Sequence, residues 1–453
     1  MNGKKESNVY GRSYYKKFKQ HLLNPLFILS FDSDKMNDTV KTIRDPIHGD
    51  IEFKGLFLDL LEAPEIQRLH NIKQLGFAHL VFPGGHHTRL EHSFGAYYMA
   101  GHAAEHLNLD SEEKELVSCA AILHDIGHGP FSHTLESILR NTLNVDHVDL
   151  TEKLILGEHA IFDHLEKEFI DHLTVFDVLN KYGMDHKKIA DIIKGSVSSK
   201  KYLSQLLDSA IDVDQLDYLI RDAYYTGVAY GMIDYNRFIQ TLTISNDNLA
   251  VEKKGVGVIE NILMARILMY SSVYFHKTVR IAELMLSKAI ELVENADPFE
   301  IFKLTDGEMI NELKKMGDLQ REIATRLKYR KLYKKAYSIG LSDLGENQME
   351  IIKKLDNFEF RRQKEIEFEE KLNIPSGKII IDVPQTELHL SEPRIDKTEI
   401  QIVDGVNPHM FDEYTPVGSA VRSKSIPEWI LMIITDEKYR ETISENAEKI
   451  LFK

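Results

Sequence analysis

The chain has 453 residues, of which 43% are hydrophobic and 28% charged, so it can bury a large core and is not expected to be disordered. Its 56 basic and 71 acidic side chains give a net charge of -15, which disfavours nonspecific attraction to nucleic acid or anionic membranes. The only cysteine, Cys119, excludes an intramolecular disulfide. A membrane-spanning helix needs an apolar run of about 18 residues, and no run in the sequence is expected to approach that length. The sequence therefore predicts a cytoplasmic protein that does not span a membrane.

Residues 1–40 are expected to form a peripheral extension with a short basic helix in "SYYKKFKQHLL". From 41 to 296 the pattern is mainly helical. Asp110, followed by Glu112 and Glu113, begins a helix that runs through "LVSCAAIL" and ends at "GHGP". "AIDVDQLDYLIRDAYY" and "GVIENILMARILMYSSVYF" have apolar residues at three- and four-residue spacing, which predicts two further helices. Between them, the alternating "LTISNDNLAVEKKG" predicts a small hairpin.

Residues 297–453 are more charged and are expected to be helical to about Lys371. "KIIIDVP" and "TEIQIVDG" predict strands, and a final helix is expected across "SIPEWILMIITDEKYRETISENAEKILF". The predicted fold class is therefore mainly α: a helical bundle with a small hairpin, followed by a C-terminal α+β region that has an oligomerisation or regulatory role.

Nine of the 20 histidines lie within the 62 residues from His86 to His147. Any one of them alone is more often a surface or satisfied core residue than a metal ligand. His124 and Asp125, however, are adjacent where an apolar helix ends, and adjacent helical side chains point about 100° apart unless the helix stops. With His92 on the preceding helix and Asp214 on a later one, the set suits a divalent ion such as Mn, Fe, Ni or Zn.

Three segments, "HTRLEHSFG", "LHDIGHGPFSH" and "IDVDQLDYLIRDAYYTG", occur in the order found in the HD-domain deoxynucleoside triphosphate triphosphohydrolases, a family that the chain resembles from about Lys41 to His276. The resemblance implies an HD-domain helical bundle with the metal ligands His92, His124, Asp125 and Asp214. It also implies hydrolysis of a deoxynucleoside triphosphate (dNTP) to a deoxynucleoside and triphosphate. A divalent ion would activate water and offset charge on the phosphorus oxygens, and magnesium accompanying the nucleotide is a further option.

The resemblance implies phosphate-side roles for Arg89, His128, His133 and His147, with His147 assisting as the general acid. Arginine suits phosphate through its planar fork, and histidine titrates near working pH. Contacts with the nucleotide are implied for Gln74, Leu75, Gln215, Tyr218, Asp222, Arg266 and Tyr274. The structural alternatives are that Arg89 only pairs with Glu91 and that the aromatic and aliphatic members only fill the core.

The chain departs from the family pattern at Gln215, where a lysine contacts the distal phosphates, at Phe275, where a glutamine reads the base, and at Val148, which replaces an acid. A nucleotidase or phosphodiesterase that acts on other phosphate esters therefore stays open. A third reading is a noncatalytic nucleotide- or nucleic-acid-binding scaffold, against which the intact ligand set argues.

The resemblance also implies a nucleotide-activated homo-oligomer, a dimer or a tetramer. The residues implied for its activator site are Lys41, Arg237, Lys254, His276, Lys277, Arg330 and Lys334. His70 and Glu62 replace an arginine and an aspartate of the guanine-binding half, so a guanosine-specific activator is not expected. The alternative is a solvated basic helix face or a nucleic-acid patch, and nucleic-acid binding stays open.

Overall fold

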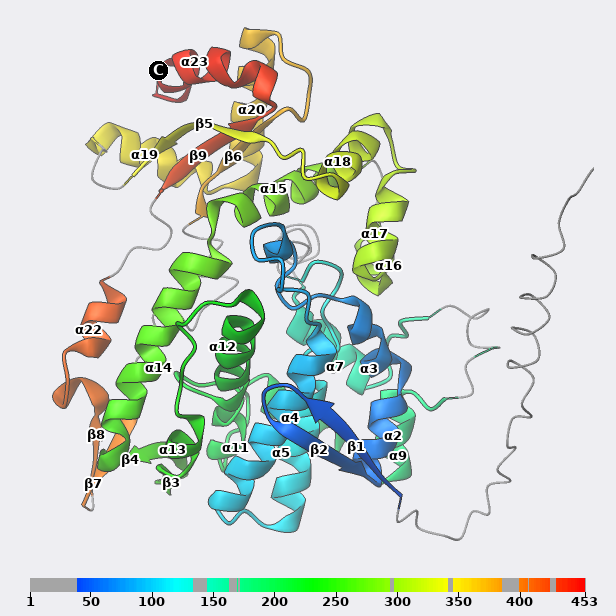
Figure 1. Cartoon of the computed structure of the whole chain (residues 1–453), viewed down its shortest axis with the longest axis vertical. Helices are drawn as coiled ribbons and strands as arrows, with labels where there is room; N and C mark the ends of the chain where they lie inside the picture. Colours follow the sequence, from blue (N-terminus) through cyan, green and yellow to red (C-terminus); the bar gives the residue numbers. More distant parts are fainter. Residues whose placement is uncertain are drawn as a thin grey trace, which may run out of the picture. The chain divides into compact units, whose positions relative to one another are not determined.

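A hairpin and a group of helices make up the first part of the chain in the computed structural model (Figure 1). The structure describes residues 39–132, 145–162, 169, 172–293, 297–340, 345–384, 399–405, 407–423 and 429–452. Residues Val40–Lys453 form one unit. The basic helix predicted in "SYYKKFKQHLL" lies outside the described residues. The hairpin pairs β1 (Val40–Asp45) with β2 (Gly49–Lys54), and the sequence patterns did not predict it.

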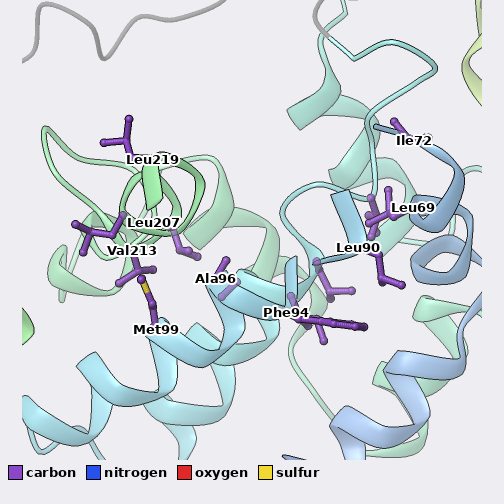
Figure 2. Packing of buried hydrophobic residues seen from close by; sticks show 14 of the residues in the cluster. Leu69, Ile72, Leu90, Phe94, Ala96, Met99, Leu207, Val213 and Leu219 are labelled. Atoms are coloured by element: carbon purple, nitrogen blue, oxygen red, sulfur yellow. The ribbon is translucent and has the colours of Figure 1, made fainter. Parts of the chain in front are cut away.

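The helices of this part follow in chain order. They are α2 (Leu56–Glu62), α3 (Pro64–Arg68), α4 (Arg89–His106), α5 (Ser111–Leu123), α7 (His147–Ile155), α9 (Val175–Lys181), α10 (His186–Ile193), α11 (Tyr202–Gln205), α12 (Val213–Thr226), α13 (Tyr235–Ile239), α14 (Val256–Met269) and α15 (Lys277–Glu291). Helix α4 packs against both α5 and α12. Figure 2 shows Ala96 and Met99 of α4 close to Val213 of α12 within the buried apolar core.

The predicted cap of α5 is confirmed. The Asp110 side chain accepts a hydrogen bond from the Glu113 backbone at 2.9 Å, and the Glu113 side chain accepts from the Asp110 backbone at 3.2 Å. This reciprocal pair satisfies two backbone N–H groups that a helix start otherwise leaves without partners. Helix α5 ends at Leu123, with His124 as its C-cap residue, as the sequence predicts.

The predicted small hairpin is also confirmed, as β3 (Leu242–Ser245) and β4 (Asn248–Glu252). Asn246 and Asp247 turn the chain with φ of 48° and 65°, which these two residue types tolerate well. Strand β4 continues the sheet by pairing in parallel with β7 (Gln401–Asp404), which pairs with β8 (Asn407–Met410). The predicted strand in "TEIQIVDG" is thus β7.

The C-terminal part combines helices with a second sheet. Its helices are α16 (Pro298–Lys303), α17 (Asp306–Leu313), α18 (Asp318–Lys328), α19 (Glu346–Leu355), α20 (Phe358–Leu372), α22 (Val417–Arg422) and α23 (Arg440–Phe452). The sheet has the order β5 (Lys334–Ile339), β9 (Leu431–Thr435), β6 (Ile379–Asp382), and β6 is the strand predicted in "KIIIDVP". The predicted fold class, mainly α with a C-terminal α+β region, is confirmed.

One prediction in this part is wrong. The single final helix is instead β9 followed by α23, because every residue of β9 is buried and a strand buried on both faces has no apolar alternation to distinguish it from a helix. The helical stretches expected to about Lys371 are present as α16 to α20, but β5, which lies among them and pairs with β9, was not predicted.

One helix in the described part of the chain, Lys253–Tyr274, is long and apolar enough to cross a membrane. The expectation that no apolar run approaches that length is therefore wrong, because α14 continues through a π-helical turn at Tyr270–Tyr274. The buried share of the most apolar window is 56%, and the fully buried Arg266 lies within the helix. Core helices of soluble proteins have the same properties.

Candidate active site

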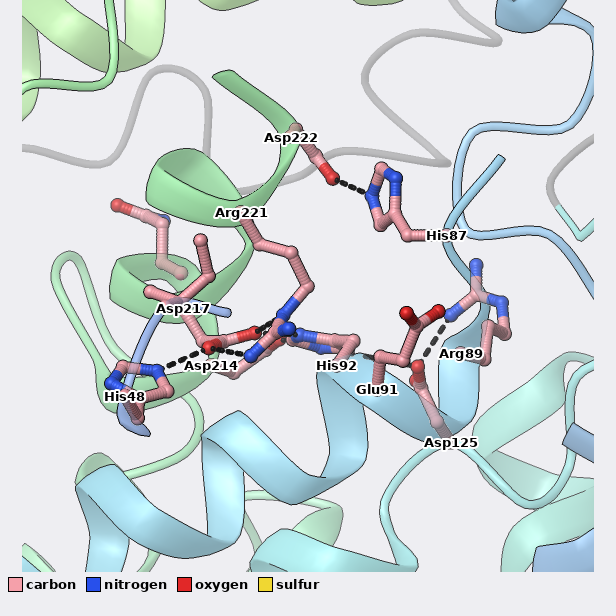
Figure 3. Close-up of polar contacts among 12 residues, drawn as sticks. His48, His87, Arg89, Glu91, His92, Asp125, Asp214, Asp217, Arg221 and Asp222 are labelled. Atoms are coloured by element: carbon pink, nitrogen blue, oxygen red, sulfur yellow. Dashed lines mark hydrogen bonds and ion pairs between the residues drawn. The ribbon is translucent and has the colours of Figure 1, made fainter. Parts of the chain in front are cut away.

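Four side chains predicted as metal ligands come together where α4, α5 and α12 meet. His92 Nε2 lies 2.9 Å from Asp214 Oδ1 and 3.9 Å from Asp125 Oδ2. His124 Nε2 lies 3.5 Å from Asp214 Oδ1 and 3.3 Å from Asp125 Oδ1. One ligand atom each from His92, His124 and Asp214 falls within 4.8 Å of the others. Figure 3 shows His92, Asp125 and Asp214 from their three segments.

The end of α5 orients His124. Its Nδ1 bonds the Ala121 carbonyl at 2.7 Å, whereas its Nε2 is buried and has no hydrogen-bond partner within the described residues. Thr151 of α7 holds the bend, because its hydroxyl donates to the His124 carbonyl at 3.1 Å and accepts from the Gly127 backbone at 3.0 Å. A Cβ at Gly127 would lie 2.1 Å from the His147 carbonyl oxygen, so this close approach requires glycine.

These donors fit a divalent metal ion. With Nδ1 of His124 donating to a carbonyl, its Nε2 presents a lone pair toward the two carboxylates. His92 does the same, since its Nδ1 donates to Asp217 at 2.8 Å while Nε2 faces Asp214. A ring nitrogen bonded to a carboxylate or a carbonyl, with the other nitrogen facing outward, is the usual arrangement of metal-binding histidines.

Asp217 anchors His92 and was not identified from the sequence as part of the site. Its carboxylate also accepts from His48 Nε2 at 2.7 Å and from Arg221 Nε and Nη2 at 2.8 and 2.9 Å (Figure 3). Gly95 makes room for it, because a Cβ there would lie 1.8 Å from Asp217 Oδ1. The i, i+4 spacing of Asp217 and Arg221 was the available signal; no spacing pointed to His48.

Burial and charge act in opposite directions on these groups. Burial opposes the charged form of His92, but hydrogen bonds with Asp214 and Asp217 outweigh it and raise the pKa of His92 to about 10. A metal ion at Nε2 would compete with that proton. Burial also opposes ionisation of Asp125, yet the nearby Arg89 guanidinium and histidines hold the pKa of that carboxyl well below its ordinary value. The carboxylate is therefore ionised at neutral pH.

Arg89, for which a phosphate role was predicted, lies beside Asp125 in the cluster. Its Nη1 donates to Asp125 at 2.6 Å and its Nε donates to the Ser132 hydroxyl at 2.7 Å. The buried Nη2 has no hydrogen-bond partner among the described residues. The alternative pairing with Glu91 is wrong, since Glu91 accepts from the Thr88 backbone and the Tyr225 hydroxyl. Arg89 therefore keeps one donor for a ligand.

His128 and His147 form a stacked pair with ring centroids 3.9 Å apart. His128 Nε2 lies 3.4 Å from Asp125 Oδ1. Burial and the Arg89 charge hold the pKa of His128 well below its ordinary value, so its ring is neutral at pH 7. His133, the remaining predicted phosphate-side histidine, lies outside the described residues.

The predicted sugar-side residues also lie near the cluster. Asp222 accepts hydrogen bonds from the Tyr274 hydroxyl at 2.6 Å and from His87 Nε2 at 2.7 Å. Tyr218 packs edge-on against both Tyr274 and His92, with centroids 6.2 and 6.3 Å apart. His87 was not identified from the sequence, although it lies next to the "TRLEH" segment.

The remaining predicted nucleotide contacts are largely buried. Arg266 Nη1 donates to the Ala210 carbonyl at 2.9 Å and to Gln215 Oε1 at 3.4 Å. Gln215 is fully buried, and its Nε2 has no hydrogen-bond partner within the described ranges. The Gln74 backbone donates to the His87 carbonyl at 3.0 Å, which places Gln74 and its neighbour Leu75 beside the segment that leads into α4.

Two of the seven predicted activator residues, Arg330 and His276, lie at one turn. Arg330 Nε donates to the Leu80 carbonyl at 2.8 Å, and His276 packs edge-on against Phe82 at 5.9 Å, so both contact the same turn. Lys254 forms an ion pair with Glu252. Exposed positions are also occupied by Lys41, Arg237, Lys277 and Lys334. The alternative of a basic helix face does not hold for Arg330 and Lys334, because α18 ends at Lys328 and Lys334 begins β5.

Comparison with known families and proteins agrees with this geometry. Residues 89–222 match the HD domain model, and residues 233–452 match the model of the HD associated region. An uncharacterised protein of Methanocaldococcus jannaschii is 31% identical over 90% of this chain and 82% of its own length. A crystal structure of a phosphohydrolase from Bacteroides thetaiotaomicron is 27% identical, with a TM-score of 0.64, and covers 88% of this chain and 100% of its own.

The chain belongs to the HD-domain phosphohydrolase family. It is also similar to the deoxynucleoside triphosphate triphosphohydrolase SAMHD1 of Bos taurus, at 30% identity over 56% of this chain. The chain spans about half of that relative, 48% of its length.

Proposed function

We propose that this protein hydrolyses deoxynucleoside triphosphates to deoxynucleoside and triphosphate, with a divalent ion held by His92, His124, Asp125 and Asp214. The observation that carries the proposal is one buried cluster in which two imidazole Nε2 atoms face two carboxylates beside Arg89. The similarity to a dNTP triphosphohydrolase supports the choice of substrate. Mn, Fe, Ni and Zn are the candidate metals for this mixed nitrogen and oxygen set.

The side chains divide the chemistry between them. A bound divalent ion supplies a water of lowered pKa and offsets charge on the phosphorus oxygens. Arg89 binds a phosphate oxygen through Nη2, while Asp125 and Ser132 fix its orientation. His147, stacked on the neutral His128, protonates the leaving oxygen. Asp222 binds the sugar, with Tyr274 and His87 fixing its two carboxylate oxygens.

The test is a panel of dNTPs given to the purified, metal-loaded protein, with triphosphate resolved from single phosphate as product. We expect intact triphosphate, and losses of more than about a hundredfold for His124→Ala and Asp125→Ala, because ligand loss exceeds the typical effect of losing a supporting residue. His102→Ala, an exposed histidine on α4, is the matched control. Unchanged hydrolysis in both ligand variants would show that the metal mechanism is wrong.

A second candidate, hydrolysis of other phosphate esters, is favoured by Gln215. This side chain is neutral, fully buried and bonded to Arg266, where a lysine for distal phosphates would be expected from the family. Nucleoside monophosphates and a phosphodiester in the same panel distinguish the two: the candidate predicts faster turnover of these than of any dNTP.

We also propose activation by a nucleotide, a homo-oligomeric assembly and a cytoplasmic location. Arg330 and His276, which contact the same turn, support an activator site on that face. The activation test adds GTP or dATP to the dNTP panel and follows the rate together with the sedimentation of the protein. Activation predicts a rise in rate with one of these nucleotides.

A further inference from the structure

A short segment of the HD associated region, Phe302–Asp306, contacts the loop that follows the His124-Asp125 pair. Arg68 joins the two from one side: its Nη2 donates to the carbonyls of Ile126 and His128 at 2.9 and 2.7 Å, and its Nη1 donates to the Phe302 carbonyl at 3.3 Å. On the other side, Asp306 Oδ1 accepts from the Phe131 backbone at 2.8 Å. The segment thus contacts the loop directly at Phe131, and through Arg68 at Ile126 and His128.

The loop needs such support because its backbone is strained. Phe131 and Ser132 are consecutive non-glycine residues with φ of 54° and 49°. Left-handed conformations are unfavourable for residues with a Cβ and persist where the surroundings hold them. The Phe131 ring stacks on Phe77 with centroids 4.4 Å apart, and the Phe131 N–H donates to Asp306 at 2.8 Å.

The same carboxylate reaches a second loop. Asp306 Oδ2 accepts from the Lys73 backbone at 3.1 Å, directly before Gln74 and Leu75. Lys73 is bridged to Thr88, the residue before Arg89. Asp306 is 4% exposed, so it makes these bonds away from water, where each is stronger.

We propose that Asp306 is a positioning residue for the phosphate side of the active site. It fixes the left-handed turn at Phe131 and Ser132, which places the Ser132 hydroxyl where Arg89 Nε bonds it at 2.7 Å. Arg89 is thereby held with Nη1 on Asp125 and Nη2 toward the ligand. The HD associated region thus completes the catalytic domain, an inference that rests on the proposed phosphate role of Arg89.

The test is a double-mutant cycle of Asp306→Ala with Ser132→Ala, measured as kcat/KM for the dNTP turned over fastest. A misplacement of about 1 Å costs on the order of a hundredfold in rate. Because Asp306→Ala removes both acceptors, we expect it to lower kcat/KM by about ten- to a hundredfold, with little further loss when it is added to Ser132→Ala. Independent losses that multiply in the double variant, or an unchanged Asp306→Ala enzyme, would overturn the proposal, since a purely structural role predicts independent effects.

Asp318→Ala is the matched control, because Asp318 also begins a helix, α18, but is fully exposed. It is expected to stay within about twofold of wild type. If Asp306→Ala does not fold, Asp306→Asn, whose amide oxygen can accept only one of the two backbone N–H groups, replaces it and is expected to give a smaller loss with the same coupling. The same double-mutant cycle is measured on the affinity of the metal-loaded protein for inorganic triphosphate. If the two substitutions are coupled in that affinity but the protein does not turn over dNTPs, the proposed function is rejected and the positioning role of Asp306 is kept.

Discussion

Two buried charge networks of similar composition lie in different parts of the molecule. One is centred on Asp217, which accepts four hydrogen bonds from His48, His92 and Arg221. The other is centred on Glu365 of α20, which accepts from Lys288 Nζ at 2.6 Å, Arg362 Nη1 at 3.1 Å and the Ile381 backbone at 2.9 Å. Both carboxylates are at most 1% exposed.

The networks differ in where they end. The Glu365 network ends on the backbone of β6 and on a second acid, Glu291, which also pairs with Lys288. The Asp217 network ends on His92, whose other nitrogen faces the carboxylates beside His124 Nε2 and Arg89 Nη2, two buried atoms without hydrogen-bond partners within the described residues. Burial of charge alone therefore does not mark function; a network that leads to unsatisfied, converging atoms does.

The largest effect is expected in the Glu365 network, on the free energy of unfolding. Lys288→Met leaves Glu365 buried without its lysine, and breaking one partner of a buried pair costs about 3–5 kcal/mol of unfolding free energy. Chemical denaturation measures the loss, while kcat per folded molecule should stay at the wild-type value. Lys371→Met on the same α20 removes an exposed partner of Glu367 and should cost less than about 1 kcal/mol. A large fall in kcat for Lys288→Met would contradict the separation of the two networks.

For Asp217→Asn we expect a smaller change in free energy, which appears in metal binding rather than in folding stability. The substitution weakens the bond that orients His92, and loss of such a supporting residue lowers metal affinity by about 10- to 100-fold. Titration calorimetry with Mn²⁺ measures this change. Asp50→Asn, at an exposed acid of β2 paired with Arg44, is the control and should bind Mn²⁺ as wild type does. Equal affinity in the two variants would show that Asp217 has only a structural role.

Much of this organisation was predictable from the sequence, because it depends on local patterns. The capped helix α5, the β3–β4 hairpin and the strands β6 and β7 follow from capping chemistry, turn residues and alternation. The convergence of His92, His124, Asp125 and Asp214 followed from a helix end and three ordered motifs. The assigned roles of these residues stay predictions until they are tested.

The rest depends on contacts between distant segments. His48 reaches Asp217 across 169 positions and Asp306 reaches Phe131 across 175, and no local spacing encodes either pair. Strand β9 was read as helix because its full burial removes the alternation that identifies a strand. The charged residues of α20 look like a solvated face in the sequence, yet Glu365 is buried by partners on other elements.

The smallest effect is expected at Glu65, a buried carboxylate with fewer hydrogen-bond donors than Asp217 or Glu365. It tests whether the number of donors decides if a buried carboxyl group is ionised. Glu65 is 2% exposed and accepts a hydrogen bond from the Val175 backbone at 3.2 Å. Burial outweighs its hydrogen bonds and raises the pKa of Glu65 above its ordinary value, whereas the pKa of the four-donor Asp217 is held well below its own. Because the pKa of Glu65 is raised in the folded state, its protonated form stabilises the folded protein. This contribution is fully present below the unfolded-state pKa of about 4.3 and is lost as the pH rises through the folded-state pKa. Glu65→Gln cannot ionise, so the unfolding free energy of wild type should fall relative to the variant between pH 4.5 and neutrality in chemical denaturation. Glu62→Gln, at an exposed position nearby, should run parallel to wild type. A parallel curve for Glu65→Gln would mean that the backbone hydrogen bonds and the nearby Arg68 suffice to keep this buried glutamate ionised.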